Sequence, residues 1–415
     1  MRLCARSLLA LAAAGVLGSG CTHENHAPFA STSITTRTKD AGSDVNVLHV
    51  GPPPLPATDG PGICGRTIVP IAATPVNLYF ILDASGSMST LIDSADTNGG
   101  IEISRYDAAR AAISDVLLAV GSRVSFGAAV FPGPITGDST DECPAGMEVF
   151  PTQQGDPPSA TASGQPGPHL KTLLRVLGAR PPSGLTPTAA SIEAVKNNLL
   201  ALEGKTYAIL LTDGAPNCDA KADCNASTCT VNIEASCGQP PSVNCCDPRL
   251  GLYDYRWCLD SDPTILAVKD LADNGVKTYV IGMPGTPPAY SALLNRVAQA
   301  GGTAQRGDAG VLSDAGASSD AGYYLAGDAA KLSAHLQHIG LSVAISCDVP
   351  LAEAPPSRDL VNVYFDQSVV PLDATDGWAW TSDTSISIVG SACNELQSGR
   401  IQEIQVVAGC PSVTR

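Results

Sequence analysis

Three separate stretches of the sequence carry oxygen-bearing side chains where strands are expected to end or helices to begin. The first, segment 83–87 (Asp-Ala-Ser-Gly-Ser), follows the apolar run 76–82. The second contains Thr186 in Gly-Leu-Thr-Pro-Thr, and the third contains Asp213, directly after the apolar run 206–212. Carboxylates and hydroxyls that converge on one point suit a small hard cation, which takes oxygen ligands. The sequence therefore indicates a cation site, provided that the fold brings the three stretches together.

The segment 83–87 has a second interpretation when it is taken alone. A strand followed by a turn rich in Ser and Gly would have the same composition. Open α/β sheets bind ligands at the carboxyl ends of their strands. The choice between a turn and a ligand site therefore depends on what the surrounding segments form.

Apolar runs and helical patterns alternate through the middle of the chain. The runs 76–82, 206–212 and 277–283 lack polar alternation, which is typical of strands buried on both faces of a parallel sheet. Apolar residues at helical spacing predict helices over 105–120, 169–177, 262–274, 290–300 and 328–341. A further helix is expected to begin within 184–188, with Thr186 as its N-cap and Pro187 in its first turn. This alternation predicts an α/β domain over 74–343 with a doubly wound, mostly parallel sheet.

The segment 346–415 has a different pattern, with short apolar runs separated by turn residues. It predicts a small β-rich module. A module of about 70 residues has little core of its own, so its Cys347, Cys393 and Cys410 are expected to form disulfides that stabilise it.

The N-terminal segment 1–20 is predicted to be a signal peptide, with two early positive charges and an apolar stretch too short to span a bilayer. The small residues before Cys21 resemble a bacterial lipoprotein signal, which is cut before the cysteine and lipidated there. Plain secretion is the alternative, because Leu17 stands one place too early for that signal. The polar, Pro-rich segment 21–73 is predicted to be a flexible tether. The expected location is the cell envelope, as an outer-membrane lipoprotein or otherwise as a periplasmic or secreted protein.

The charge balance restricts the partners. With a net charge of -16 and no basic stripe, the chain is not expected to bind nucleic acid, and it is expected to meet a membrane only through its lipid anchor. The charge is compatible with cation binding. No stretch provides a nucleophile or a general base in a recognisable motif, so the chain is not expected to be an enzyme.

In order and spacing, the three oxygen-bearing stretches resemble the metal-ion-dependent adhesion site of the von Willebrand factor A (VWA) domain. The resemblance covers about 270 residues, 74–343, and implies a Rossmann-like sheet with one divalent cation at its top. By position, Ser85, Ser87 and Thr186 would supply hydroxyls, and Asp83 and Asp213 would bind directly or through water. Thr188, the second threonine of Gly-Leu-Thr-Pro-Thr, is not counted among these five ligands.

The resemblance also implies the ion and its partner. Mg²⁺ is the foremost candidate, with Mn²⁺ or Ca²⁺ as alternatives. Because three of the five ligands are neutral, an open coordination position favours an anionic oxygen from outside, and in the family that oxygen is an Asp or Glu carboxylate of a partner protein. The expected function is binding of a protein ligand with an exposed Asp or Glu. The alternatives are a VWA subunit of a larger envelope assembly with a structural role and no metal-bridged ligand, and a degenerate domain that binds no metal.

The cysteines fit an exported protein. Of the 14 cysteines, Cys4 is expected to be removed with the signal peptide and Cys21 to be lipidated. The remaining 14 - 2 = 12 cysteines are an even number, which suggests disulfides in an exported protein. Zinc is the weaker alternative, since no Cys-x-x-Cys pair occurs among the candidates. The fold of the family divides the candidates into two groups that are not expected to mix. The first group comprises Cys143 and the cysteine-rich insertion 217–260, with Cys218, Cys224, Cys229, Cys237, Cys245, Cys246 and Cys258; the second comprises Cys64, Cys347, Cys393 and Cys410. The insertion either shapes access to the cation or is a passive loop.

Overall fold

The computed structural model describes most of the chain from residue 67 onward. The described residues are 67–72, 74–93, 102–134, 143–157, 164–214, 216–219, 256, 258–286, 288–304, 322–398, 400–401 and 403–415. The predicted signal peptide, Cys21, the greater part of the tether and most of the insertion lie outside these residues.

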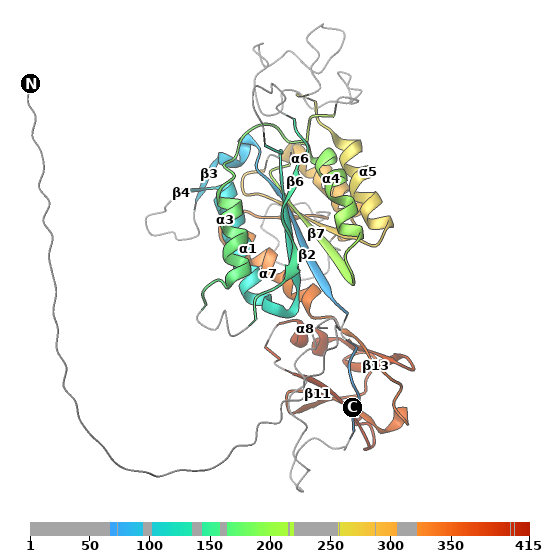
Figure 1. Ribbon diagram of the computed structural model, residues 1–415. Coiled ribbons are helices and arrows are strands. Elements are labelled where there is room, and N and C mark those ends of the chain that lie inside the picture. The colour runs from blue at the N-terminus through green and yellow to red at the C-terminus, as the bar shows by residue number, and fades with distance from the viewer. Residues whose placement is uncertain are drawn as a thin grey trace, which may run out of the picture. The chain divides into compact units, whose positions relative to one another are not determined.

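A six-stranded sheet forms the centre of the α/β part, in the order β6-β5-β2-β7-β8-β9 (Figure 1). Its strands are β2 (Val76–Asp83), β5 (Ser125–Phe131), β6 (Met147–Gln154), β7 (Lys205–Thr212), β8 (Lys277–Gly282) and β9 (Tyr324–Leu325). All neighbouring pairs are parallel except β5 with the edge strand β6, which is antiparallel. The two strands that precede the predicted cation ligands, β2 and β7, are therefore adjacent and end at the same edge.

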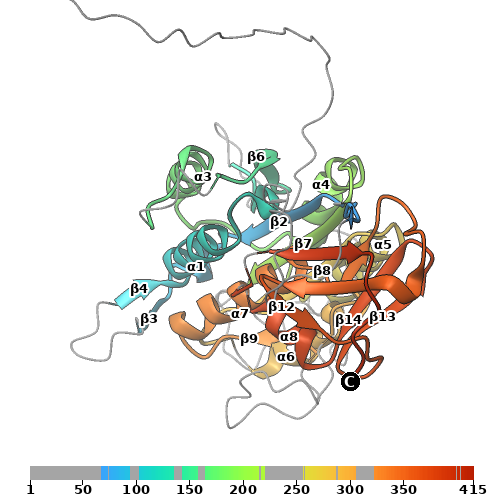
Figure 2. The ribbon, with the colours of Figure 1, turned by 90° about the horizontal axis from the view of Figure 1, so that it is seen from below.

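Helices cover both faces of this sheet. One face packs against α1 (Arg105–Val120), α3 (Pro168–Gly178) and α7 (Ala329–Ala344), and the other packs against α4 (Thr188–Leu200), α5 (Ser261–Asp273) and α6 (Pro288–Ala300). Figure 2 shows α1 and α3 on one side of the sheet and α4 and α5 on the other. The side chains of β2 alternate between the two faces and contribute to both hydrophobic cores. Phe80 packs in the core that includes α1, and Tyr79 and Ile81 pack in the core that includes α4. The predicted fold class, α/β with a doubly wound, mostly parallel sheet, is confirmed.

Two helix starts differ from the prediction. The helix α4 begins at Thr188 with Pro187 as its N-cap, so Thr186 lies before the helix and is not its cap. The main chain of Thr186 is instead bonded to Asn217, which holds it away from helical geometry. The helix α5 begins at Ser261 with Asp260 as its N-cap, two residues before the predicted start.

A small hairpin beside the sheet was not predicted. It consists of β3 (Leu91–Asp93) and β4 (Glu102–Ser104) and follows the 3-10 helix η1 (Gly86–Ser89). A second 3-10 helix, η2 (Gly121–Arg123), extends α1. Strands of three residues are too short to show a period of two, which is why the pattern did not reveal them.

The C-terminal part is β-rich, as predicted. One sheet has the order β1-β15-β11-β12 and the other has the order β10-β14-β13, with a common core around the fully buried Trp378. Its elements are β10 (Asp348–Pro350), η5 (Arg358–Leu360), β11 (Val361–Phe365), β12 (Ser368–Val370), β13 (Gly377–Ser382), β14 (Ser385–Val389), α8 (Ser391–Gln397) and β15 (Ile404–Ala408).

One strand of the first C-terminal sheet comes from the segment assigned to the tether. The strand β1 (Thr67–Ile68) pairs with β15, and Val69 is buried in the C-terminal core. The predicted tether boundary at residue 73 is therefore too late. The reason is a pairing between residues more than 300 positions apart, which local composition does not encode.

None of the helices within the described ranges is both long enough and apolar enough to span a membrane.

Candidate metal centre

Asp83 is the anchor of the site at the end of β2. Its side chain is fully buried, and both carboxylate oxygens accept a hydrogen bond. The hydroxyl of Thr212, the last residue of β7, donates to Asp83 Oδ2 at 2.7 Å. The backbone N–H of Ser85 donates to Asp83 Oδ1 at 2.8 Å. The carboxylate therefore ties the ends of two central strands to the loop that follows the first of them.

The two serines of this loop point to the same place. The 3-10 helix η1 turns the chain back directly after Ser85, and the buried Met88 fixes it to the core. As a result, Ser85 Oγ and Ser87 Oγ lie 3.0 Å apart. Two hydroxyl oxygens at that separation can face one ligand.

The loop that carries Thr186 is held against this serine loop by backbone hydrogen bonds. The N–H of Gly86 donates to the carbonyl of Gly184 at 3.0 Å, and the N–H of Ser183 donates to the carbonyl of Ala84 at 2.8 Å. Gly184 has a φ of 79°, a left-handed conformation that a residue without Cβ adopts readily. Thr186 itself is buried.

Asn217 fixes Thr186 from the other side. The amide oxygen of Asn217 accepts from the N–H of Thr186 at 2.8 Å, and the N–H of Asn217 donates to the carbonyl of Thr186 at 3.0 Å. Asn217 is fully buried. The second threonine, Thr188, donates its hydroxyl to the Thr186 carbonyl at 3.4 Å.

Asp213 follows β7 and pairs with a cation of the chain itself. Arg105, the first residue of α1, places Nη1 2.8 Å from Asp213 Oδ2, and both side chains are at least nine-tenths buried. The same guanidinium donates to the carbonyls of Pro284 and Gly285, each at 2.8 Å. Arg105 therefore joins Asp213 to the loop after β8.

The charges at the site act on one another. Burial raises the pKa of Asp83, and the negative charge of Asp213 raises it further, while hydrogen bonds from Thr212 and Ser85 act in the opposite direction. A second positive charge between the two carboxylates would remove this repulsion. Two carboxylates and three hydroxyls also form an all-oxygen donor set, which is what Mg²⁺ selects. The residues present therefore fit a divalent cation.

All five predicted ligand positions thus lie at one edge of the sheet, Asp83 at the end of β2 and the other four on the loops beyond the strands. Asp83, Ser85 and Ser87 are joined by direct hydrogen bonds, and Asp213 acts on Asp83 through its charge. The loop that carries Thr186 is held next to the serine loop by backbone hydrogen bonds.

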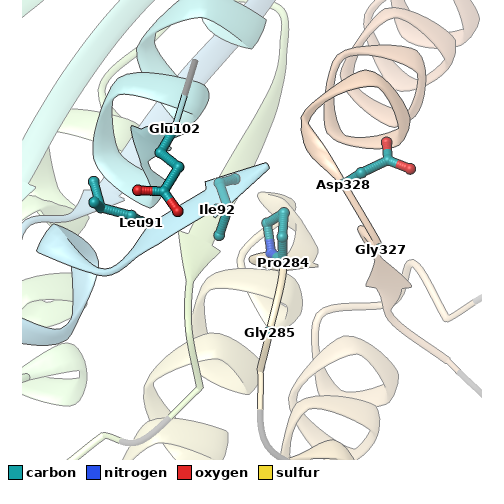
Figure 3. A pocket seen from close by; sticks show the side chains of 7 residues that line it. All are labelled: Leu91, Ile92, Glu102, Pro284, Gly285, Gly327 and Asp328. Carbon is teal, nitrogen blue, oxygen red and sulfur yellow. The ribbon is translucent and has the colours of Figure 1, made fainter. Parts of the chain in front are cut away.

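A pocket of about 290 Å³ is lined in part by Pro284 and Gly285, the loop residues that Arg105 contacts. Figure 3 shows Glu102 of β4 and Asp328, which precedes α7, on opposite sides of Pro284. The other lining residues are Leu91, Ile92 and Gly327. None of the five predicted ligands lines this pocket, so it adjoins the candidate centre without being part of it.

The described disulfides stay within the two predicted groups. Cys143 is bonded to Cys218, and Cys347 is bonded to Cys393. Cys410 is also disulfide-bonded, and Cys258 is buried. Cys64 and the insertion cysteines 224, 229, 237, 245 and 246 lie outside the described residues, so the separation of the two groups as a whole stays a prediction.

No protein-family model matches the sequence, and no curated protein matches it. Solved structures with a similar chain path include the pilus adhesin SpaC from Lactobacillus rhamnosus GG, with 17% identity over 80% of this chain and 39% of that chain and a TM-score of 0.43. The PilB minor pilin from Streptococcus sanguinis has 19% identity over 66% of this chain and 62% of that chain, with a TM-score of 0.40. The vWF domain of the type V pili tip protein Mfa5 from Porphyromonas gingivalis has 14% identity over 65% of this chain and 95% of that chain, with a TM-score of 0.36.

This chain spans about two fifths of the length of the SpaC chain. At these TM-scores the likeness is one of general chain path and carries no conclusion about ligand or partner. Membership of the VWA family stays a prediction.

Two residues of the site were not predicted, Arg105 and Asn217. A positive charge in the first turn of a helix opposes the helix dipole, and this signal at Arg105 was available in the sequence. Nothing local marks Asn217, because its partner Thr186 is 31 residues away.

Proposed function

We propose that the chain is an exported, lipid-anchored protein that binds a divalent cation, Mg²⁺ foremost, and through it a carboxylate of a protein partner. Asp83, Ser85, Ser87, Thr186 and Asp213 would hold the ion. An adhesion role follows from this chemistry, and the proposal rests on the site rather than on the likeness to pilus proteins.

One observation carries the proposal, the meeting of two buried carboxylates and a hydroxyl pair at the ends of adjacent strands. Buried carboxylates that repel each other are unfavourable unless a cation neutralises them. Arg105 supplies one positive charge against Asp213, which leaves the charge of Asp83 to be neutralised.

The ion, when bound, supplies a Lewis-acidic position open to an external anion. The chain's own residues would fix that position: Asp83 through its two hydrogen bonds, and Ser85 and Ser87 through the turn of η1. A divalent ion (+2) together with Asp83 and Asp213 (−2) and Arg105 (+1) would give the site a net charge of +1, which would favour a carboxylate over a neutral ligand.

The disulfides support an oxidising location. Bonds between Cys143 and Cys218 and between Cys347 and Cys393 are typical of exported proteins, since the cytosol keeps thiols reduced.

Isothermal titration calorimetry tests the metal site. After chelation and dialysis, the wild-type chain is expected to bind Mg²⁺, and Asp83→Asn is expected to lose this binding with little change in shape. Asp273→Asn, which changes an exposed carboxylate of α5, serves as the matched control and is expected to bind as wild type does. Absence of Mg²⁺ binding by the wild-type chain would contradict the proposal.

A pull-down from envelope extracts tests the partner. Proteins that the wild-type chain retains in Mg²⁺ are expected to be released by a chelator and to be missing with Asp83→Asn. Retention that is equal in both chains would remove the metal-bridged partner from the proposal.

The alternative, a structural subunit of an envelope assembly, is favoured by the pair of Arg105 with Asp213. This pair gives the site a built-in cation and lets it exist without a metal. A partner that remains bound in chelator and with Asp83→Asn would select this alternative.

A further inference from the structure

Arg105 places a permanent positive charge against the candidate metal centre. Its Nη1 atom lies 2.8 Å from Asp213 Oδ2 and 3.5 Å from the carbonyl oxygen of Ser87, and both of these residues are predicted ligands. No other ion pair in the described part of the chain includes a predicted ligand. Arg105 is therefore the internal charge that a bound ion would meet.

The guanidinium of Arg105 is held in this position by the loop after β8. Its Nε donates to the carbonyl of Pro284 and its Nη2 donates to the carbonyl of Gly285, each at 2.8 Å. Gly285 has a φ of 77°, and a Cβ atom there would lie 2.8 Å from Nη2, so a glycine lets this loop close on the guanidinium. The side chain is also nine-tenths buried, so its charge stays beside the site instead of moving to solvent.

The place of Arg105 in α1 does not serve the helix. It is the first residue of α1, where a positive charge opposes the helix dipole. The hydrogen bonds of its side chain all reach residues outside α1, in the loops after β2, β7 and β8. The position of this charge is thus explained by the candidate centre rather than by the helix that carries it.

The net charge of the candidate centre depends on Arg105. The carboxylates of Asp83 and Asp213 together with the guanidinium give a net charge of −1, and a divalent ion would change it to +1. One carboxylate from a partner would then bring the site to zero. With a neutral residue at position 105, the ion alone would bring the site to zero. Because uncompensated charge is unfavourable away from water, Arg105 makes the ion-loaded site complete only with an anion.

We propose that Arg105 makes the ion and the partner carboxylate bind cooperatively, because it weakens binding of the ion alone and keeps one positive charge in excess for the partner. This inference rests on the proposed Mg²⁺ function and names the residue that sets its coupling. By linkage, the ion raises the affinity for the carboxylate by the same factor as the carboxylate raises the affinity for the ion. Arg105 acts here through its charge and does not itself contact the partner.

Isothermal titration with Mg²⁺ tests the first half of the proposal on the full chain. Arg105→Gln removes the charge and keeps an amide that can donate to the loop carbonyls, and it is expected to bind Mg²⁺ at least about 10-fold more tightly than wild type. Arg105→Lys keeps the charge without the planar fork and is expected to remain near wild type. Arg296→Gln, on the exposed face of α6, is the matched control and is expected to bind as wild type does.

A role of Arg105 limited to holding the loop after β8 predicts the opposite sign. Both Arg105→Gln and Arg105→Lys would then bind Mg²⁺ more weakly than wild type, because both lose the fork that contacts Pro284 and Gly285. The direction of the change in Arg105→Gln therefore separates a charge role from a merely structural one.

Acetate, as a carboxylate probe, tests the second half. The titrations are repeated in potassium acetate and in potassium chloride of equal ionic strength, with free Mg²⁺ set by a metal indicator because acetate itself complexes the ion. Acetate is expected to tighten Mg²⁺ binding by wild type and by Arg105→Lys at least about 3-fold, and to leave Arg105→Gln unchanged.

Three outcomes would overturn the proposal. They are equal or weaker Mg²⁺ binding by a folded Arg105→Gln chain, no effect of acetate on wild type, and loss of the acetate effect in Arg105→Lys. Circular dichroism in chelator checks folding, and if Arg105→Gln is unfolded there, the acetate series on wild type and Arg105→Lys decides. Absence of Mg²⁺ binding by wild type would instead refute the proposed function itself, whereas wild-type binding that Arg105→Gln leaves unchanged refutes only the role of Arg105.

Discussion

Asp83 and Asp260 are two buried carboxylates that differ in what surrounds them. In both, burial is the first cause of a raised pKa, and a neighbouring carboxylate adds to it. Asp83 accepts hydrogen bonds from Thr212 and Ser85. Asp260 has an oxygen without a partner, although it stands at a helix N-cap.

The difference shows how the same residue type is used in two ways at one edge of the fold. Around Asp83 the chain supplies its own donors and a nearby guanidinium, so the site is organised in advance. Around Asp260, one carboxylate oxygen is buried without a hydrogen-bond partner among the described residues.

The largest expected effect is that of Arg105→Met, which removes the internal cation of the first site. The change leaves Asp213 buried and unpaired near Asp83, and breaking a buried ion pair costs about 3–5 kcal/mol. Urea unfolding in chelator is the measurement. Mg²⁺ is expected to restore part of the loss, since an external cation would then neutralise both carboxylates.

The control for this change is Arg296→Met, which breaks the exposed pair with Asp262. Exposed pairs contribute about 0–1 kcal/mol, so little destabilisation is expected. Equal losses in the two variants would show that the buried pair has no special role.

A smaller effect is expected from pH acting on Asp260. Its folded-state pKa of about 7 lies above its ordinary value near 4, so the folded chain keeps a proton that the unfolded chain releases. The stability contributed by this group therefore falls as pH rises from about 4 to about 7. Asp260→Asn is expected to gain about 4 kcal/mol over wild type across this range, measured by urea unfolding at several pH values. A constant difference between the two chains would contradict the buried, raised pKa.

The smallest effect comes from a matched pair of changes, Thr212→Val and Thr264→Val. The first removes the hydroxyl that donates to Asp83 and accepts from Gly214, and it is expected to cost about 1–2 kcal/mol. The second removes a hydroxyl without a partner, and in chelator it is expected to cost nothing or to stabilise slightly. Thermal unfolding compares them. Equal destabilisation by both changes would mean that the Thr264 hydroxyl has a partner within the chain.

Much of the fold was predictable from local pattern. The helix predicted over 105–120 has those bounds in the structure, because its apolar positions recur at helical spacing and Gly121 ends it. The strands before Asp83 and Asp213 were predictable because a strand buried on both faces lacks polar alternation. The order of the ligand motifs then indicated which loops would meet.

Other features depend on contacts between distant residues and escaped prediction. The strand β1 forms only because β15 offers it an edge, and the hairpin of β3 and β4 is too short to show a period. Asp260 was not singled out, because the cap of α5 was placed two residues later, at Asp262.

By itself, the sequence determined the alternation of strands and helices and the residue types at the candidate metal centre, since both follow from local spacing. Only the tertiary structure decided that Arg105 neutralises Asp213, that Asn217 holds Thr186, and that Asp260 lacks a partner. These are pairings across 31 to 108 residues, or the absence of one. A side chain's partner is set by which segments pack together, and packing is a property of the whole chain rather than of any stretch of it.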